Sequence, residues 1–187
     1  MLKHGTICLL LNVLVRELAP LLANFIVVVR SGTAIATELA HMRMEGEIDV
    51  LDAQGLDPMI YLVMPRVIAT GISVFCLAVL IVAVSFLSGY VVCELLGAVR
   101  GGPAVFFGDI LSAVGREELY FFLPKTLISG FFIGAICSLE GLSIRGAVTE
   151  IPQVAGRGAV RSLTIVFGVS ALLSLIIYGS VLFIDVF

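Results

Sequence analysis

Four long apolar runs divide the chain, and each is long enough to form a membrane-spanning helix. They cover residues 5–29, 67–92, 119–139 and 162–184. A helix needs about 20 apolar residues to cross the hydrocarbon core of a bilayer. The pattern therefore predicts an all-α, polytopic membrane protein, a helical bundle with four spans.

The composition supports this fold class and excludes several others. Hydrophobic residues make up 60% of the 187 residues and charged residues 13%, against roughly 45–50% and 25% in soluble domains. A soluble fold of this size could not bury so much apolar surface, so much of it must face lipid. The net charge of −3 and the lack of a basic stripe argue against a nucleic-acid partner.

No catalytic or cofactor-binding pattern is present in the sequence. The two histidines, His4 and His41, are too few for a histidine-based metal site, and no nucleotide-binding glycine motif occurs. We therefore expect no enzyme activity, cofactor or metal, and place any ATP hydrolysis in another chain. The four cysteines lack metal-ligand spacing and are expected to be small buried hydrophobic residues: Cys8, Cys76, Cys93 and Cys137.

The positive charges predict the orientation of the bundle. With four spans, the segments 30–66 and 140–161 lie on one side of the membrane, and together they carry six Lys and Arg residues. The opposite side carries three. Because positive charge concentrates on the cytoplasmic side, we expect both termini outside and the 30–66 loop inside. The counted residues are Arg30, Arg43, Arg66, Arg145, Arg157 and Arg161 inside, and Lys3, Arg100 and Arg116 outside.

The 30–66 loop carries a helical pattern with an acidic face. Ile35, Leu39 and Met42 recur at helical spacing, and Gly55 suits a helix C-terminus. One or two short helices beneath the membrane are expected. A surface helix without special role is one interpretation; the other is docking to a basic cleft of a protein partner, which an acidic face beside anionic lipid favours. The acids are Glu38, Glu45, Glu47, Asp49, Asp52 and Asp57.

Three ionisable residues lie inside the predicted spans: Arg16, Glu17 and Lys125. A charge at mid-bilayer costs about 2.5–3.5 kcal/mol on insertion scales, so such residues face protein or a watery cavity. Arg16 and Glu17 point about 100° apart on a helix and are poor partners for each other. We expect Glu17 to pair with Lys125, or Arg16 with a lipid phosphate. A buried pair that only fixes helix packing is the alternative.

Several sequence blocks resemble the MlaE/YrbE-type permeases, the membrane subunits of ABC systems that move lipids with MCE-domain proteins. The resemblance covers nearly the whole chain in order, and its blocks up to residue 66 are the most specific. These blocks are RELAP at 16–20, RSGTAIATEL at 30–39, EIDVL at 47–51, GLDP at 55–58 and YLVMPR at 61–66, followed by LPKTLISGF at 123–131, GLSIRG at 141–146 and GRGAVRS at 156–162.

The resemblance implies a multi-pass permease of the inner membrane. It implies a homodimer with a pair of ABC ATPases on its cytoplasmic side, an MCE-domain ring outside, and a lipid cavity between the two permease chains. The family's coupling helix corresponds to residues 38–55, so ATPase-coupling residues would be Glu38, Glu45, Glu47, Asp49, Asp52 and Gly55. The lipid-cavity candidates are Arg16, Glu17, Leu10, Leu14, Leu18, Leu21, Lys125 and Arg157.

The chain departs from the family pattern in three places. It begins too late to include the family's N-terminal interfacial helix and first span, which leaves four spans of five in a single permease domain, residues 1–187. The last span lacks, at residues 168–171, an acid that some members carry. Gly46 could divide the coupling helix into two.

A lipid-transport subunit is therefore the expected function, with a membrane anchor or assembly scaffold as the alternative. Charged groups inside the spans discriminate between them, because an anchor has no need of Arg16, Glu17 or Lys125 within lipid. Gly130 and Gly134 form a GxxxG pattern that we expect to serve packing within one chain rather than dimerisation.

Overall fold

The computed structural model describes residues 17–95, 108, 116–144 and 150–186, and within these ranges it contains helices and no strand. Two of the elements, η2 and η3, are single π-helical turns. In chain order the elements are α2 (Ala19–Val27), η2 (Val28–Gly32), α3 (Thr33–Met44), α4 (Glu47–Ala53), η3 (Met59–Val63), α5 (Met64–Leu95), α7 (Arg116–Leu142) and α8 (Ile151–Val186).

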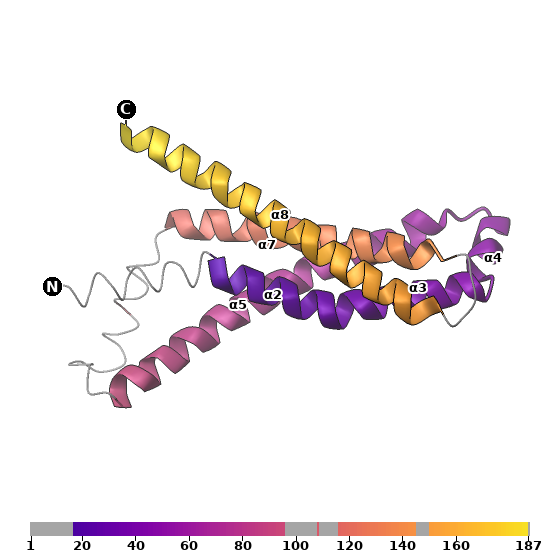
Figure 1. Cartoon of the computed structure of the whole chain (residues 1–187), viewed down its shortest axis with the longest axis horizontal. Coiled ribbons are helices and arrows are strands. Elements are labelled where there is room, and N and C mark those ends of the chain that lie inside the picture. The colour runs from indigo at the N-terminus through magenta and orange to yellow at the C-terminus, as the bar shows by residue number, and fades with distance from the viewer. Residues whose placement is uncertain (1–16, 96–107, 109–115, 145–149, 187) are drawn as a thin grey trace.

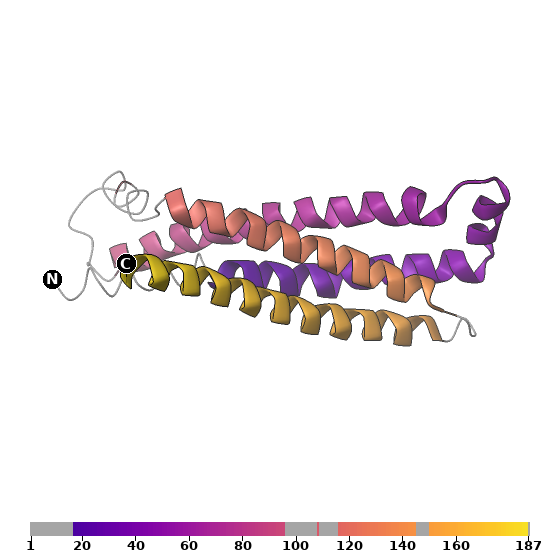
Figure 2. The same ribbon diagram turned by 90° about the horizontal axis from the view of Figure 1, so that it is seen from above.

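The long helices run side by side along one axis, and α4 lies across one end of the bundle (Figures 1 and 2). Four stretches of them are long and apolar enough to cross a membrane, which confirms the polytopic all-α prediction. The end of α3, the end of α7 and the beginnings of α5 and α8 lie at the same end of the bundle (Figure 1), as expected for helices joined on one side of a membrane. The stretches are Ala19–Met44, Met59–Val91, Phe122–Leu142 and Ile151–Ile176.

The first described span ends later than the sequence predicted. Helix was expected to stop near residue 29, with a loop beginning at Arg30, but α2, η2 and α3 form one continuous rod up to Met44. Both residues that flank the π turn have right-handed helical geometry, and the Thr33 backbone amide donates to the Val28 carbonyl. The Thr33 hydroxyl also donates to the Val29 carbonyl (2.6 Å). The rod therefore continues because side chain and backbone together satisfy the carbonyls of the turn.

Two other spans begin earlier than predicted. The second begins at Met59 rather than at residue 67, and the fourth at Ile151 rather than at residue 162. Polar residues at these helix ends interrupted the apolar runs without interrupting the helices. The predicted start of the first span, residues 5–16, lies outside the described residues. Helix α7 includes residues 119–121, the predicted start of the third span.

Two glycines bound α4, as the sequence indicated. Gly46 (φ 78°) separates α3 from α4, and Gly55 (φ 76°) follows the end of α4. The Gly55 amide donates to the Asp52 carbonyl, and the Leu56 amide donates to the Leu51 carbonyl. This pair of hydrogen bonds is a Schellman motif, which needs a left-handed residue at the glycine position. The short helix is thus fixed at both ends by positions where only glycine is unstrained.

Helices α5 and α7 approach each other through small residues. A Cβ atom on Gly130 would lie 2.7 Å from the Gly71 Cα, and one on Gly134 would lie 2.9 Å from the Val67 Cα. The Thr70 hydroxyl, in the same contact, lies 3.2 Å from the Gly130 carbonyl and donates to it. The GxxxG pattern therefore serves packing within one chain, as expected.

Candidate functional site

Three polar side chains form a ring of hydrogen bonds inside the bundle and join the beginning of the first described span to α7 and α8. The Lys125 ammonium group on α7 donates to Glu17 Oε2 (2.8 Å) and to the Ser174 hydroxyl on α8 (2.9 Å). The Ser174 hydroxyl donates in turn to Glu17 Oε1 (2.8 Å), just before α2 begins. Each carboxylate oxygen thus accepts one hydrogen bond, and the cation and anion neutralise each other.

The network is buried on one side and open on the other. Lys125 exposes 4% of its side chain, whereas Glu17 exposes 28%. A lysine this deeply buried needs a partner, because an unpaired charge in an apolar medium is very costly. The open edge of the network is therefore the carboxylate of Glu17, where a polar group from outside the chain could reach it.

This arrangement confirms the predicted pairing of Glu17 with Lys125. Arg16, the other ionisable residue of the first span, lies outside the described residues, as do Leu10 and Leu14. Of the remaining leucine candidates, Leu18 is exposed and Leu21 is half-buried. Leu18 therefore has apolar surface next to the network that is free to contact lipid chains.

Sequence reasoning missed Ser174. The absence of an acid at residues 168–171 had placed a polar network in this span in doubt, but a serine one turn further on supplies the hydrogen bond. Ser162, Ser170 and Ser174 are spaced by eight and four residues, so they share one face of α8. Small polar residues on one face of an apolar span often mark helix contacts, and this signal could have found it.

A second polar contact lies further along the same helices. The Ser129 hydroxyl donates to Asn24 Oδ1 (2.8 Å), and Asn24 is almost fully buried. Its amide nitrogen has no hydrogen-bond partner among the described residues. Asn24 follows Glu17 by seven residues and Ser129 follows Lys125 by four, so the contact lies on the same faces of α2 and α7 as the ion pair. Neither Asn24 nor Ser129 was predicted as a site residue from the sequence.

At the other end of the bundle, α4 packs through an apolar cluster. The buried members of this cluster are Leu39, Ile48 and Leu62, from α3, α4 and η3. Ile35 and Met42, two positions of the predicted apolar stripe, pack against them. The helical spacing predicted short helices here, and the structure shows that the stripe also holds α4 to the bundle.

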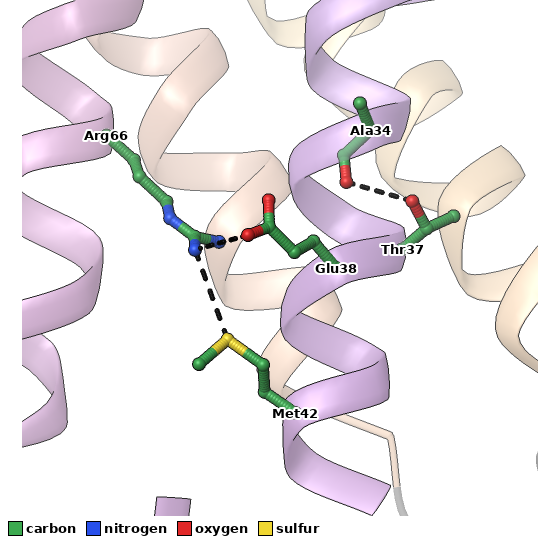
Figure 3. A network of polar contacts seen from close by, with 5 residues as sticks. All are labelled: Ala34, Thr37, Glu38, Met42 and Arg66. Carbon is green, nitrogen blue, oxygen red and sulfur yellow. Dashed lines mark hydrogen bonds and ion pairs between the residues drawn. The ribbon is translucent and has the colours of Figure 1, made fainter. Parts of the chain in front are cut away.

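The predicted acidic face is partly neutralised within the chain. Glu45 lies 3.1 Å from His41, Asp49 lies 3.3 Å from Arg43, and Glu38 lies 3.0 Å from Arg66. Figure 3 shows the last of these pairs, with Arg66 reaching from α5 to Glu38 on α3. The acids that form no ion pair with any other described residue are Glu47, Asp52 and Asp57, on and just after α4.

The two arginines before the last span differ in their surroundings. Arg161 forms an ion pair with Glu140 and so links α8 to α7. Arg157 is exposed and has no ion pair within the part of the chain that the structure describes. Arg157, the predicted lipid-contacting residue, is therefore free to meet a group from outside the chain.

Comparison with known proteins identifies the family. The model of the family described as Permease MlaE matches residues 3–176. The chain belongs to the MlaE permease family. The earlier resemblance is thereby confirmed, and with its four apolar helices the chain is a multi-pass membrane protein of this permease family.

Relatives of the chain carry related names. A probable ABC transporter permease protein of Synechocystis is 34% identical over 133 residues, which cover 71% of this chain and 50% of that protein. One from Rickettsia typhi is 43% identical over 128 residues, or 68% of this chain and 49% of that protein. The protein TRIGALACTOSYLDIACYLGLYCEROL 1 of Arabidopsis thaliana is 30% identical over 128 residues, or 68% of this chain and 35% of that protein. The chain thus spans about half the length of the permeases it matches, and about a third of the Arabidopsis protein.

Proposed function

We propose that this permease moves phospholipid or a related lipid across or out of a membrane. The observation that carries the proposal is the network of Glu17, Lys125 and Ser174, because it holds a carboxylate partly open inside an apolar bundle. A membrane anchor gains nothing from such charges, whereas a lipid path needs polar groups for the headgroup and apolar surface for the chains. Exposed Leu18, next to Glu17, offers such apolar surface.

The names of relatives point in the same direction. The Arabidopsis relative carries the name of a diacylglycerol glycolipid, and the bacterial relatives are named ABC transporter permeases. ABC transport requires ATP hydrolysis, which no motif of this chain supplies. We therefore expect the lipid to be moved at the expense of ATP hydrolysed by a separate ATPase subunit.

The proposed assembly is a homodimer in the inner membrane, with an MCE-domain protein outside and an ATPase at the α4 end. Glu47, Asp52 and Asp57 form no ion pair with other described residues, and their negative charge on and beside α4 supports the ATPase site. Gly46 and Gly55 fix the ends of this helix, so its acids keep a constant geometry toward a partner.

Charge reversal at Glu17 tests the proposal. Glu17→Lys would place two cations together in a buried network, at a cost above the 1.4 kcal/mol that corresponds to a tenfold change in rate. We expect lipid transfer by the reconstituted complex to fall by roughly tenfold or more at equal expression. The measurement is transfer of labelled phospholipid between proteoliposomes and the MCE-domain partner.

A matched variant separates this effect from a general loss of negative charge. Glu94→Lys reverses an exposed acid near the end of α5, and we expect it to leave transfer unchanged. Wild-type transfer by Glu17→Lys would remove Glu17 from the mechanism. If the wild-type complex assembles but transfers no lipid, the chain is instead an anchor or scaffold.

A further inference from the structure

The ion pair between Glu38 and Arg66 joins two helices that both pack on α7 but have few direct contacts with each other. α3 packs mainly against α7 and α8, whereas α5 packs mainly against α7 and α2. Arg66 Nη2 donates to Glu38 Oε1 (3.0 Å) and lies 4.0 Å from the Met42 sulfur (Figure 3). The arginine therefore bridges directly from the second span to the rod of the first span.

The chain between these two residues is the segment that carries α4. It turns at Gly46, just after α3, and at Gly55, and both glycines have positive φ. Three buried side chains, Leu39, Ile48 and Leu62, pack α4 against its neighbours. The apolar cluster and the Arg43–Asp49 ion pair hold α4 to its neighbours, and the Glu38–Arg66 pair links α3 to the beginning of α5.

The beginning of α5 is not held by a regular helical ladder. It follows the π turn η3, and Pro65 has no backbone N–H to donate to the preceding turn. Arg66 comes immediately after this proline. The side-chain bond from Arg66 to Glu38 therefore fixes the first turn of α5 at the point where its backbone bonds are irregular.

Because Arg66 is largely buried, separating it from the Glu38 carboxylate is energetically costly. Arg66 exposes 21% of its side chain and Glu38 exposes 62%, and the buried Arg66 Nη1 has no acceptor among the described residues. If Glu38 moved away, the guanidinium would remain half-buried without a carboxylate. The two groups are thus constrained to move together or to separate completely.

We propose that Glu38 and Arg66 form a strut that transmits displacement of α4 to the first and second spans. Glu38 is then a positioning residue that acts through Arg66, and it is not a contact for the ATPase. This inference rests on the proposed function, in which a partner ATPase engages α4. The ATPase would instead contact Glu47, Asp52 and Asp57, which form no ion pair with other described residues.

The test compares Glu38→Gln with the charge swap Glu38→Arg/Arg66→Glu in the complete reconstituted complex. We expect Glu38→Gln to keep the ATPase bound and hydrolysing ATP at the wild-type rate, while lipid moved per ATP falls about fivefold. The swap restores the ion pair with the two charges exchanged. We expect it to bring the amount of lipid moved per ATP most of the way back to the wild-type value. His41→Gln is the control, since it alters an exposed contact with Glu45 at the end of α3 that does not involve α5, and it should leave the ratio unchanged.

Several results would contradict the proposal that the Glu38–Arg66 pair transmits displacement of α4 to the spans. Loss of the ATPase from the Glu38→Gln complex would make Glu38 a docking contact, and an unchanged ratio of lipid to ATP would make it irrelevant to coupling. A swap that folds but does not recover the ratio would also contradict it. If neither variant folds, the pair only maintains the fold, and the proposal is wrong.

Hydrogen exchange on the isolated chain separates this inference from the proposed function. Removing a partly exposed ion pair should speed amide exchange across residues 47–66 by about two- to fivefold in Glu38→Gln. His41→Gln should not change exchange in that segment. Unchanged exchange in Glu38→Gln would overturn the strut even if lipid is transported, whereas a wild-type complex that moves no lipid would overturn the proposed function.

Discussion

At the scale of single residues, partners decide whether a charge is tolerated inside the bundle. Lys125 is almost fully buried, yet it has a carboxylate and a hydroxyl within 2.9 Å. Asn24 is equally buried but satisfies only its carbonyl oxygen among the described residues. A buried polar atom without a partner costs stability, so residues of this kind persist where packing or function requires them.

The stability of the Lys125 site is testable by removing its partner. Glu17→Gln should lower the free energy of unfolding by roughly 3 kcal/mol, the lower end for a buried ion pair because Glu17 is partly exposed. The measurement is thermal unfolding of the purified protein in detergent or nanodiscs. Combining Glu17→Gln with Lys125→Met removes the stranded charge and should recover most of the loss. A double variant as unstable as the single one would contradict this account.

At the scale of elements, glycines determine both where helices end and how closely they pack. Gly46 and Gly55 adopt positive φ and delimit α4. Gly71, Gly130 and Gly134 lie inside long helices and allow α5 and α7 to approach within backbone contact distance. The same residue type thus breaks helices in the connecting segment and brings helices together in the spans.

Adding one methyl group at this helix contact should separate the two helices. Gly134→Ala would place Cβ within 2.9 Å of the Val67 Cα, so the backbones must shift, and overpacking of this kind costs about 1–3 kcal/mol. We expect a corresponding decrease in thermal stability.

A glycine in α8 provides the control for this substitution. Nothing lies within 4 Å of a Cβ atom placed on Gly168, so Gly168→Ala should be neutral or stabilise the helix by about 0.5–1 kcal/mol. Equal losses in both variants would show that the close contact between α5 and α7 is not the cause.

At the scale of the whole molecule, apolar side chains cover the outer surface of the spans. Leu80 and Leu87 on α5 and Leu172 and Leu175 on α8 are among the exposed residues. Polar residues concentrate at the α4 end and along the inner faces of α2, α7 and α8. This is the reverse of a soluble protein, and it accounts for the high hydrophobic content of the sequence.

The proposed orientation predicts which end reacts with a membrane-impermeant reagent. After replacement of the native cysteines, Gln54→Cys beside α4 and Glu150→Cys before α8 should be labelled from the cytoplasmic side only. Both residues are exposed, and α4 and the beginning of α8, which they adjoin, lie at the same end of the bundle (Figure 1). Glu94→Cys, an exposed position beyond the end of the second span, should be labelled from the opposite side. The reverse pattern would invert the orientation and move the proposed ATPase site away from α4.

Local pattern was sufficient to predict the helical class, the four spans, the break at Gly46 and the end of α4 at Gly55. These features depend on apolar run length and on backbone freedom, both of which can be read from neighbouring residues. The pairing of Glu17 with Lys125 was also predictable, because few partners exist for a charge inside a span. The continuation of the first helix past Arg30 was not predictable from local pattern, since polar residues there are compatible with either loop or helix.

Tertiary structure alone decided which distant residues meet. Ser174 completes the buried network across 157 residues of sequence, and Arg66 reaches Glu38 across 28. Residue type and spacing along one helix indicate which face is polar, but they do not indicate the rotation and relative height of two packed helices. Those depend on close contacts such as the one between Gly130 and Gly71, which arise only when the whole bundle packs.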